Sequence, residues 1–564
     1  MAKVNAGKAV ARLLRDYGVK YVFGLPGGET LSIYDGIREL QPEIRHVLVR
    51  DERNGAFMAD GYARFSYKPG VCDGTVGPGA LNMVTGIAEA YYSSIPVVAL
   101  ISDISTAFVG RNATHECDQI RIFKSITKLA LRTSKAEGVP DAVRKAFRTA
   151  TSDRPGPVVL DFPEDVILSG TVDQEKLFIG EGCGMYPSRR VNPDPRRIKE
   201  ATELLLKSEK PIMLVGGGGI ISQAYDEVLT LSTLLVMPVA TTMTGKGIIS
   251  ESHPLSVGTV GMYGSRFANN ALKDSDLVLV VGSKLTDYDT AKYAIPKANQ
   301  TIIQVDADPK QIGKTFPTKV RLVGDAKLAL QSLTIALKER TEKKGRSIGE
   351  APRVCELAKL RKEWLDSLAP KTDSDKFPCT PHRIIKEIRS YLSDTDILVC
   401  DASTAGLWGA MLYHMPRAGR FFAAPRGIAP IGYGFPAAIG AKMAAPNKRV
   451  LSFIGDGGFG LSLTELDTAI RTNTQITVLV HNNFSLGFIK FGQNAMFGGR
   501  TMSVDFKKEL DYGKIAEAYG CFGRRVERPS EIVDALKEAE DSGKPSVIDV
   551  PEDPTELVPP ITLG

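Results

Sequence analysis

The stretch VLSFIGDGGFGLSLTEL, residues 450–466, joins an apolar run to a cluster of glycines that encloses one carboxylate, Asp456. The run VLSFI shows no alternation of polar and apolar residues, which is typical of a strand buried on both faces of a parallel sheet. We predict a strand over VLSFI, a turn at GDGG and a helix after it. Within SLTE, Ser462 and Glu465 have the spacing of a capping box at the start of that helix.

Seven further apolar runs alternate with helical patterns along the chain. This alternation predicts an α/β protein built from repeated strand–helix units with parallel sheets. A chain of 564 residues is too long for one hydrophobic core. We therefore predict three doubly wound parallel-sheet domains, over residues 1–170, 190–340 and 375–550. The Gly- and Pro-rich residues 165–195 and the charged, then Pro-containing residues 338–383 are expected to connect them. The seven runs are PVVALIS (96–102), GPVVLDFP (156–163), PIMLVGG (211–217), DLVLVVGS (276–283), TIIQVDAD (301–308), DILVCDAS (396–403) and ITVLVHNN (476–483).

The composition is that of a globular enzyme, with 43% hydrophobic and 24% charged residues. The net charge of +6 is small for this length and the basic residues are scattered, which argues against a nucleic-acid partner. No apolar run approaches the length of a bilayer span, and the N-terminus lacks a signal-peptide core, so no membrane partner is expected. The seven cysteines are widely spaced without a CxxC pair, which favours reduced thiols in the cytoplasm.

Asp456 would oppose a phosphate at this glycine turn unless a divalent cation lay between them. Mg²⁺ suits that role because it prefers carboxylate, amide and carbonyl oxygens together with phosphate oxygens. Asn483 ends the predicted strand ITVLVHNN and lies 27 residues after Asp456, the interval expected for strand, helix and next strand. The sequence therefore predicts a magnesium site made by Asp456, Asn483 and a backbone carbonyl near Ser485.

The pairing of Asp456-Gly457 with Asn482-Asn483, separated by residues 458–481, resembles the metal–diphosphate motif of thiamine diphosphate enzymes. The GDGG segment alone is more often an ordinary turn. The resemblance implies that thiamine diphosphate and Mg²⁺ are the cofactors. The diphosphate is then expected to contact the backbone of the surrounding glycines, Gly455, Gly457 and Gly458.

Thiamine chemistry also needs a carboxylate on the pyrimidine ring, in a site dry enough to raise its pKa. Three segments resemble the pyrimidine-binding domain of acetohydroxyacid synthases and their relatives: GLPGGETLSIYDGI (24–37), DERNGAFMADGYAR (51–64) and GTVGPGALNMVTGIAEAY (74–91). The resemblance implies that Glu52, which follows the expected strand IRHVLV, is the activating carboxylate. Without it, the charge run around Glu52 would be typical of a solvated edge.

Two segments of the last domain resemble further parts of the thiamine site. In PRGIAPIGYGFPAAIGAK (425–442), Ile431 stands where acetolactate synthases commonly carry Met, which implies that it bends the cofactor; a lone Ile would otherwise be core packing. The carbonyl of Ala429 is implied to receive the pyrimidine amino group. The segment DASTAGLW (401–408) lies where the synthases have Gly-Gln-His, and this resemblance implies diphosphate contacts from Ser403, Thr404 and Ala405.

Segments of the middle domain, among them PIMLVGGGGI (211–220) and VVGSKLTDYD (280–289), resemble the acetohydroxyacid synthase domain that binds FAD in a non-redox role. Other branches of the family bind ADP there, or nothing, and these alternatives stay open. Lys246 or Arg266 could serve a pyrophosphate. Lys284 replaces the arginine that touches the flavin nucleotide in the synthases, and lysine meets a phosphate only as a point charge.

The substrate pocket departs from the synthases at Thr114 and His115, where they carry Phe-Gln, and at Gly492, where they carry Trp. His115 could shuttle protons in catalysis, or it could be a hydrogen-bonded structural histidine.

The resemblance implies an acetolactate synthase-like enzyme, which decarboxylates a 2-oxoacid such as pyruvate and joins the remainder to an acceptor carbonyl. The alternatives are a 2-oxoacid decarboxylase, a pyruvate oxidase-like enzyme, a 2-hydroxyacyl lyase, or a non-catalytic binding or regulatory member. Because family active sites lie between subunits, a homodimer or homotetramer is implied. The identity of donor and acceptor, and the need for a regulatory subunit, stay open.

Overall fold

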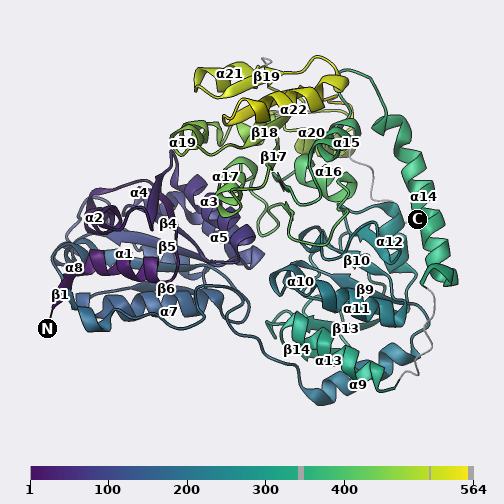
Figure 1. Cartoon of the computed structure of the whole chain (residues 1–564), viewed down its shortest axis with the longest axis horizontal. Coiled ribbons are helices and arrows are strands. Elements are labelled where there is room, and N and C mark those ends of the chain that lie inside the picture. The colour runs from purple at the N-terminus through teal and green to yellow at the C-terminus, as the bar shows by residue number, and fades with distance from the viewer. Residues whose placement is uncertain (1, 341–347, 507–509, 557–564) are drawn as a thin grey trace.

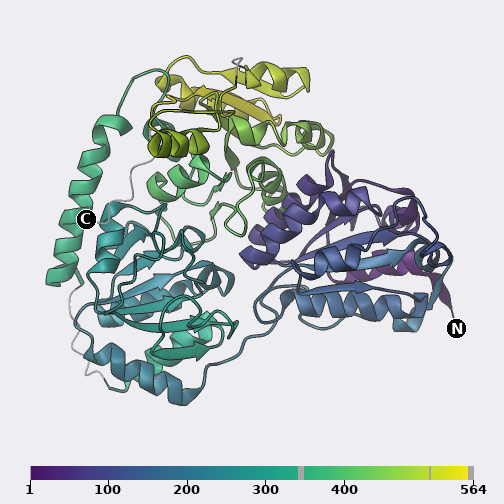
Figure 2. The ribbon, with the colours of Figure 1, turned by 180° about the vertical axis from the view of Figure 1, so that it is seen from behind.

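The computed structural model describes residues 2–340, 348–506 and 510–556. It contains three six-stranded sheets in which every strand pair is parallel, and helices cover the sheets on both faces (Figure 1). The prediction of an α/β protein with three doubly wound sheets is thus confirmed. In Figure 1 the first sheet lies in the purple part of the chain, the middle sheet in the teal part and the last sheet in the green to yellow part; Figure 2 shows the same arrangement from behind.

The first sheet has the strand order β3-β2-β4-β5-β7-β6. Its strands are β2 Tyr21–Gly24, β3 Arg45–Leu48, β4 Gly70–Gly74, β5 Val97–Asp103, β6 Leu129–Arg132 and β7 Val158–Pro163. A short antiparallel pair, β1 Lys3–Asn5 with β8 Thr171–Asp173, lies beside it. The helices are α1 Ala6–Asp16, α2 Leu31–Glu39, α3 Glu52–Ser66, α4 Pro78–Asn82, α5 Val84–Ser93, α6 Gln119–Lys124, α7 Val139–Thr151 and α8 Glu164–Leu168.

The middle sheet has the order β11-β10-β9-β12-β13-β14. Its strands are β9 Pro211–Val215, β10 Val239–Thr241, β11 Ser256–Thr259, β12 Leu277–Val281, β13 Thr301–Asp306 and β14 Val320–Val323. Its helices are α9 Pro195–Lys207, α10 Gly217–Ile221, α11 Tyr225–Leu235, α12 Arg266–Lys273 and α13 Ala326–Lys338.

The last sheet has the order β16-β15-β17-β18-β20-β19. Its strands are β15 Ile397–Cys400, β16 Phe422–Ala423, β17 Val450–Gly455, β18 Thr477–Asn482, β19 Phe522–Arg525 and β20 Ser546–Pro551. Its helices are α15 Pro381–Tyr391, α16 Thr404–Leu412, α17 Gly434–Ala444, α18 Asp456–Phe459, α19 Leu466–Arg471, α20 Gly487–Phe497, α21 Tyr512–Ala518 and α22 Ile532–Asp541.

Each of the eight apolar runs of the sequence contains a strand, because a strand in the middle of a covered sheet buries both faces. The connection over residues 338–383 is more ordered than its composition suggests. It contains α14 Pro352–Thr372, a 21-residue helix that runs along the outer edge of the middle and last domains (Figure 1). The charged run KERTEKKGRS (338–347) precedes this helix, and its residues 341–347 lie outside the described part of the chain.

The predicted capping box at SLTE is wrong. The chain enters a helical turn at once, as α18 beginning with Asp456, and the side chain of Ser462 caps no backbone N–H. The carboxylate of Glu465 instead accepts hydrogen bonds from Arg50 N, at 3.1 Å, and Asn54 Nδ2, at 3.1 Å, in the first domain. The Glu465 side chain therefore forms a buried contact between domains, whereas the local pattern predicted that it would cap the helix.

The first and last domains share one hydrophobic core, in which α3 packs on α17. Glycines let the two helices touch backbone to backbone. A Cβ on Gly61 would lie 2.0 Å from the carbonyl oxygen of Ala437, and a Cβ on Gly440 would lie 2.0 Å from that of Met58. Because any side chain there would force the helices apart, this contact fixes α3, which begins with Glu52, against the last domain.

All seven cysteines are unpaired, as the sequence predicts. Within the described ranges, no helix is both long and apolar enough to cross a bilayer.

Candidate active site

The predicted metal ligands lie at the carboxyl ends of two adjacent strands, β17 and β18, which pair in parallel with Gly455 opposite His481. Asp456 follows the first strand and is 3% exposed; Asn483 follows the second and is 7% exposed. The Asn483 Oδ1 atom accepts hydrogen bonds from the backbone N–H and the hydroxyl of Ser485, both at 3.2 Å. The structure thus places Asp456, Asn483 and Ser485 at one buried edge of the sheet.

These oxygens fit a magnesium ion that is shared with a diphosphate. Burial raises the pKa of Asp456 to about 7, and the charge of the nearby His481 ring opposes this rise. No group of three His, Cys, Asp or Glu side chains that could hold a metal occurs in the described part of the chain. One carboxylate, one amide and one carbonyl leave several positions of an octahedral ion for phosphate and water, which is how Mg²⁺ is usually bound.

The glycines around Asp456 are needed for close contacts. A Cβ on Gly458 would lie 2.1 Å from Asp401 Oδ2, and a Cβ on Gly457 would lie 2.8 Å from Leu486 Cδ2. Gly455 has more room, since its Cβ would lie 3.4 Å from His481 Nε2. The bare backbone at this edge is the cradle expected for a diphosphate.

Asp401 is a site residue that the sequence analysis missed. Its carboxylate is buried and accepts hydrogen bonds from Gly432 N, at 3.0 Å, and Gly434 N, at 2.9 Å. Burial raises its pKa to about 6. Asp401, the first residue of the segment DAST, therefore binds the loop that carries Ile431 and also lies against the glycine turn. Its position directly after an apolar strand was the available signal.

His481 was also missed, although the quoted run ITVLVHNN contains it. The imidazole is buried, and its Nδ1 atom lies 2.8 Å from Glu552 Oε2, which raises the pKa of the histidine. Its Nε2 atom has no hydrogen-bond partner among the described residues. The positive charge of the ring lowers the pKa of nearby Asp456, so this buried pair stabilises the ionised metal ligand.

The other predicted contacts of the last domain lie on turns that lead to this edge. Ser403, with φ of +66°, precedes α16, so that the backbone N–H groups of Thr404 and Ala405 are at a helix N-terminus. Ala429 has φ of +55°, and Ile431, two residues later, is 37% exposed. An apolar side chain that leaves the core in this way is available to a cofactor rather than to packing.

Glu52 is buried at the start of α3, with an exposed fraction of 4%. Its Oε2 atom accepts a hydrogen bond from Asn82 Nδ2 at 2.9 Å, and its Oε1 atom lies 2.9 Å from the position of a Cβ on Gly79. Within the described residues no hydrogen bond joins Glu52 to Asp456 or Asn483. The carboxylate expected to activate the cofactor and the metal edge thus belong to different domains.

His115 borders the same glycine turn as Glu52, because a Cβ on Gly77 would lie 3.2 Å from the Cβ of His115. The histidine is exposed and has φ of +72°. Thr114 is exposed beside it, and Gly492 on α20 has open space where a side chain would begin. His115 is therefore no buried structural histidine, and it stays a prediction for the substrate pocket.

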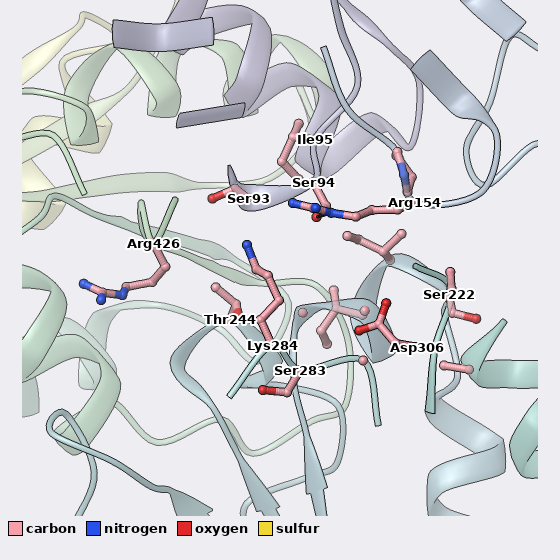
Figure 3. A pocket seen from close by; sticks show the side chains of 18 of the residues that line it. Ser93, Ser94, Ile95, Arg154, Ser222, Thr244, Ser283, Lys284, Asp306 and Arg426 are labelled. Carbon is pink, nitrogen blue, oxygen red and sulfur yellow. Dashed lines mark hydrogen bonds between the residues drawn. The ribbon is translucent and has the colours of Figure 1, made fainter. Parts of the chain in front are cut away.

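A cavity of about 130 Å³ lies at the carboxyl ends of the middle-sheet strands, where the first and last domains meet the middle domain (Figure 3). Cationic side chains from all three domains line it: Arg64 and Arg154 from the first, Lys284 from the middle, and Arg420 and Arg426 from the last. Burial lowers the pKa of Lys284 to about 8, and its Nζ atom donates a hydrogen bond to the carbonyl of Tyr92. Burial also raises the pKa of Asp306, at the end of β13, to about 6.

Two pyrophosphate candidates of the sequence analysis do not line this cavity. Lys246 is buried in an ion pair with Glu251, with 2.6 Å between Nζ and Oε1, and lines a different cavity beside α14. Arg266 is exposed at the start of α12. Neither residue is therefore in place to contact a pyrophosphate in this cavity, and their part in binding one stays a prediction.

Comparison with known proteins places this geometry in a family. Three thiamine pyrophosphate enzyme models match the chain: the N-terminal TPP binding domain over residues 4–122, the central domain over 198–333 and the C-terminal TPP binding domain over 401–550. The chain is 38% identical to a probable acetolactate synthase large subunit of Methanocaldococcus jannaschii, covering 100% of this chain and 94% of that protein. It is 32% identical to the acetolactate synthase large subunit of Haemophilus influenzae and 31% identical to the isozyme 3 large subunit of Escherichia coli, each over 100% of this chain and 97% of the relative. The chain therefore belongs to the thiamine pyrophosphate-dependent enzymes, in the family of the acetolactate synthase large subunits.

Proposed function

We propose that the chain is an acetolactate synthase that decarboxylates pyruvate and joins the remaining two-carbon unit to a second 2-oxoacid. The observation that carries this proposal is the buried edge of Asp456 and Asn483, which has the oxygen donors for Mg²⁺ and bare glycine backbone beside it. The relatives named acetolactate synthase match the chain from end to end, which supports the same reaction here.

Each predicted residue has a defined task in this reaction. When bound, thiamine diphosphate supplies the carbon nucleophile that attacks the 2-oxoacid and takes up the electron pair released with CO₂. Asp456, Asn483 and the carbonyl of Ser485 would hold the metal and the diphosphate. Glu52 would hold a proton at the pyrimidine ring, and its burial would keep water from competing for that proton. Ile431, which is partly exposed, would contact the cofactor and bend it.

The assembly proposed for this function is a homodimer or homotetramer with active sites between subunits. Large apolar side chains are exposed on and beside the last-domain segments that carry the site, and contiguous exposed apolar surface marks an interface. They are Ile428, Ile431, Leu461, Ile489, Met496, Phe497, Met502 and Phe506. A first domain from a second copy would bring a Glu52 to this surface, which the separation of Glu52 from Asp456 within one chain also favours.

The cavity of the middle domain is proposed to hold FAD or ADP. Arg154, Lys284 and Arg426, three of the cations that line it, suit a diphosphate, and Asp306 at a strand end suits a ribose hydroxyl. The lysine at position 284 lacks the bidentate fork of an arginine, so we expect the phosphate to be held mainly by Arg154 and Arg426. This nucleotide has no redox part in the proposed reaction.

Two further expectations follow from the relatives and from the cysteines. Because the relatives are named large subunits, a smaller regulatory subunit is a candidate partner. Seven unpaired cysteines fit the reducing cytoplasm.

Product analysis tests the function. Purified chain is incubated with pyruvate, thiamine diphosphate and Mg²⁺, and the products are followed by NMR. The proposal expects acetolactate. Acetaldehyde without acetolactate would instead make the chain a decarboxylase, and acetate with oxygen uptake would make it an oxidase. Untouched pyruvate would show that the pocket with Thr114, His115 and Gly492 serves another substrate.

A further inference from the structure

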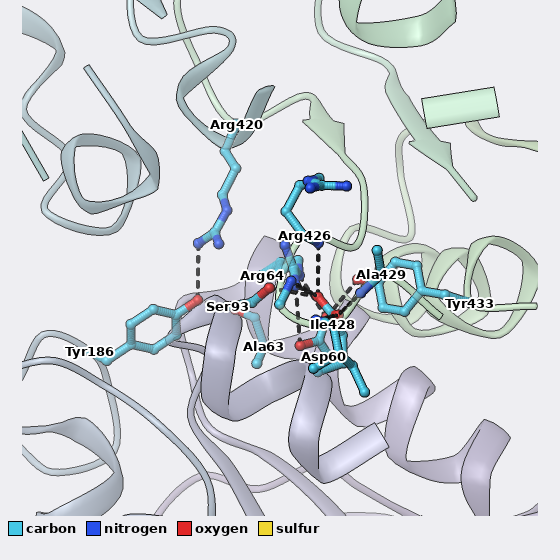
Figure 4. Close-up of polar contacts among 12 residues, drawn as sticks. Asp60, Ala63, Arg64, Ser93, Tyr186, Arg420, Arg426, Ile428, Ala429 and Tyr433 are labelled. Carbon is cyan, nitrogen blue, oxygen red and sulfur yellow. Dashed lines mark hydrogen bonds and ion pairs between the residues drawn. The ribbon is translucent and has the colours of Figure 1, made fainter. Parts of the chain in front are cut away.

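The last-domain loop that contains Arg426, Ile428 and Ala429 donates backbone hydrogen bonds to a carboxylate of the first domain, Glu89 (Figure 4). Glu89, on α5, is completely buried; it lies in the quoted segment 74–91 but is none of the site residues described above. Its two oxygens accept hydrogen bonds from four consecutive backbone N–H groups: Arg426 at 3.0 Å and Gly427 at 2.9 Å on Oε1, and Ile428 at 2.9 Å and Ala429 at 3.0 Å on Oε2.

Further polar contacts fix the position of the Glu89 carboxylate. Ser93 Oγ donates to Oε1 at 2.6 Å, and Arg64 Nη2 lies 3.6 Å from the same atom. Arg64 is in turn paired with Asp60, which accepts a hydrogen bond from Tyr433 of the last domain. A buried carboxylate with this many donors has one favourable arrangement, because each lost donor leaves charge unsatisfied in a dry interior.

The loop itself is built to lie against α5. A Cβ on Gly427 would be 2.4 Å from the carbonyl oxygen of Glu89 and 3.0 Å from its Oε2 atom. The next residues take the chain through the left-handed turn at Ala429, with φ of +55°. Glycine at 427 and the turn at 429 are therefore both needed for the four N–H groups to point at one carboxylate.

This loop leads directly to Ile431 and is held again beyond it. Asp401 accepts hydrogen bonds from Gly432 N and Gly434 N, so carboxylates of two different domains hold the backbone on either side of Ile431. Between them, Ala429 and Ile431 are the residues expected to meet the pyrimidine and to bend the cofactor. The side chain of Ile431 is 37% exposed, so neighbouring packing contributes little to its position.

We infer that Glu89 is a positioning residue for the thiamine site: by binding the N–H groups of residues 426–429, the first domain sets where Ala429 and Ile431 meet the cofactor. This inference rests on the proposed function. A glutamine at position 89 would turn an NH₂ group toward backbone donors, so that it keeps about half of the acceptors and adds a repulsion. The loop would then leave its position without any change in a group that touches the cofactor.

The test compares Glu89→Gln with wild type and with Glu540→Gln, the same substitution in a partly exposed ion pair of the last domain. Thiamine diphosphate binding is measured by calorimetry at saturating Mg²⁺, and the melting temperature is measured without cofactor. We expect the dissociation constant of Glu89→Gln to rise by about 10- to 100-fold. The control variant should bind as wild type does. Glu89→Asp, which keeps the charge on a shorter side chain, should recover part of the loss.

A second variant covers the case in which Glu89→Gln fails to fold. Gly427→Ala leaves the carboxylate intact but pushes the loop away from α5, so it should weaken cofactor binding in the same direction and alter the near-ultraviolet circular dichroism of the bound cofactor. If the variants that fold lower only the melting temperature and bind thiamine diphosphate as wild type does, Glu89 is merely structural and the inference is wrong. A wild-type chain that binds no thiamine diphosphate would overturn the proposed function as well.

Discussion

The last and middle domains present the same kind of sheet edge with opposite chemistry. Both have six parallel strands and glycine turns at the carboxyl ends. In the last domain, the edge buries the carboxylate of Asp456 with the amide of Asn483. In the middle domain, the edge opens into a cavity whose cations, among them Arg154, Lys284 and Arg426, come from three domains.

In both domains the fold provides a place for a phosphate, and the side chains at that place determine how the phosphate is bound. An edge with its own carboxylate needs a metal between itself and the phosphate, whereas an edge lined by cations can bind the phosphate directly. The first arrangement brings a divalent ion to the reacting cofactor. The second brings none, so we expect it to bind a nucleotide without catalysis.

The largest effect should follow from removing the carboxylate of the last-domain edge. Asp456→Asn is expected to lower acetolactate formation by more than about 10³-fold, since the diphosphate loses its metal. The measurement is the steady-state rate at saturating Mg²⁺ and thiamine diphosphate. A loss of less than about tenfold would mean that the metal lies elsewhere.

The same substitution should have the opposite effect on the stability of the cofactor-free protein. Because burial raises the pKa of Asp456 to about 7, its ionisation opposes folding. The cost is absent below about pH 4, grows as the pH rises to about 7 and is complete above it, at up to about 4 kcal/mol. The melting temperature of cofactor-free Asp456→Asn should therefore be higher than that of wild type at pH 8 and equal to it at pH 4. Equal melting temperatures at pH 8 would contradict the raised pKa of Asp456.

Glu52→Gln is expected to have the next largest effect, and it separates binding from chemistry. The amide cannot give a proton to the pyrimidine ring, so turnover should fall by about 10²- to 10⁴-fold. Affinity for thiamine diphosphate should stay within about threefold of wild type, because Glu52 lies outside the metal edge. Calorimetry and steady-state kinetics on the same preparation provide both numbers. Turnover at the wild-type rate would rule out this role for Glu52.

A smaller effect is expected at the middle-domain edge. Lys284→Gln removes one of the cations that line the cavity and should weaken FAD or ADP binding by about tenfold. Arg266→Gln is the matched control, since Arg266 is exposed and does not line the cavity. Fluorescence titration with each nucleotide provides the measurement. Loss of nucleotide binding in the control alone would show that the cavity has been assigned wrongly.

The smallest effect should come from His115. Its side chain is exposed at the glycine turn near Glu52, so His115→Gln is expected to change kcat/KM for pyruvate by less than about tenfold. The ratio of acetolactate to acetaldehyde, measured by NMR, tells whether it moves protons in the reaction. A loss as large as that of Glu52→Gln would place His115 among the catalytic residues.

The sequence could predict what depends on short stretches of chain. The spacing of Asp456 and Asn483 is set by one strand–helix–strand unit, and Glu52 follows a strand, so both appear in a local pattern. The apolar runs predicted the strands because a buried parallel strand needs only its own side chains. The middle cavity could not be predicted in this way, since its cations lie far apart in the chain.

Contacts between domains explain the errors. Glu465 has the spacing of a capping residue, but it binds Arg50 and Asn54 of the first domain. Glu89 lies in a quoted segment, yet nothing nearby in the sequence shows that its partners are residues 426–429. In each case a partner distant in sequence decided the role of the side chain.

The central claim is that the edge formed by Asp456 and Asn483 is where a metal holds thiamine diphosphate. Calorimetric titration of the purified wild-type chain with thiamine diphosphate, with and without Mg²⁺, tests it most directly. We expect thiamine diphosphate binding to require Mg²⁺ and to disappear in Asp456→Asn. Binding of equal strength without Mg²⁺, or in the variant, would contradict it.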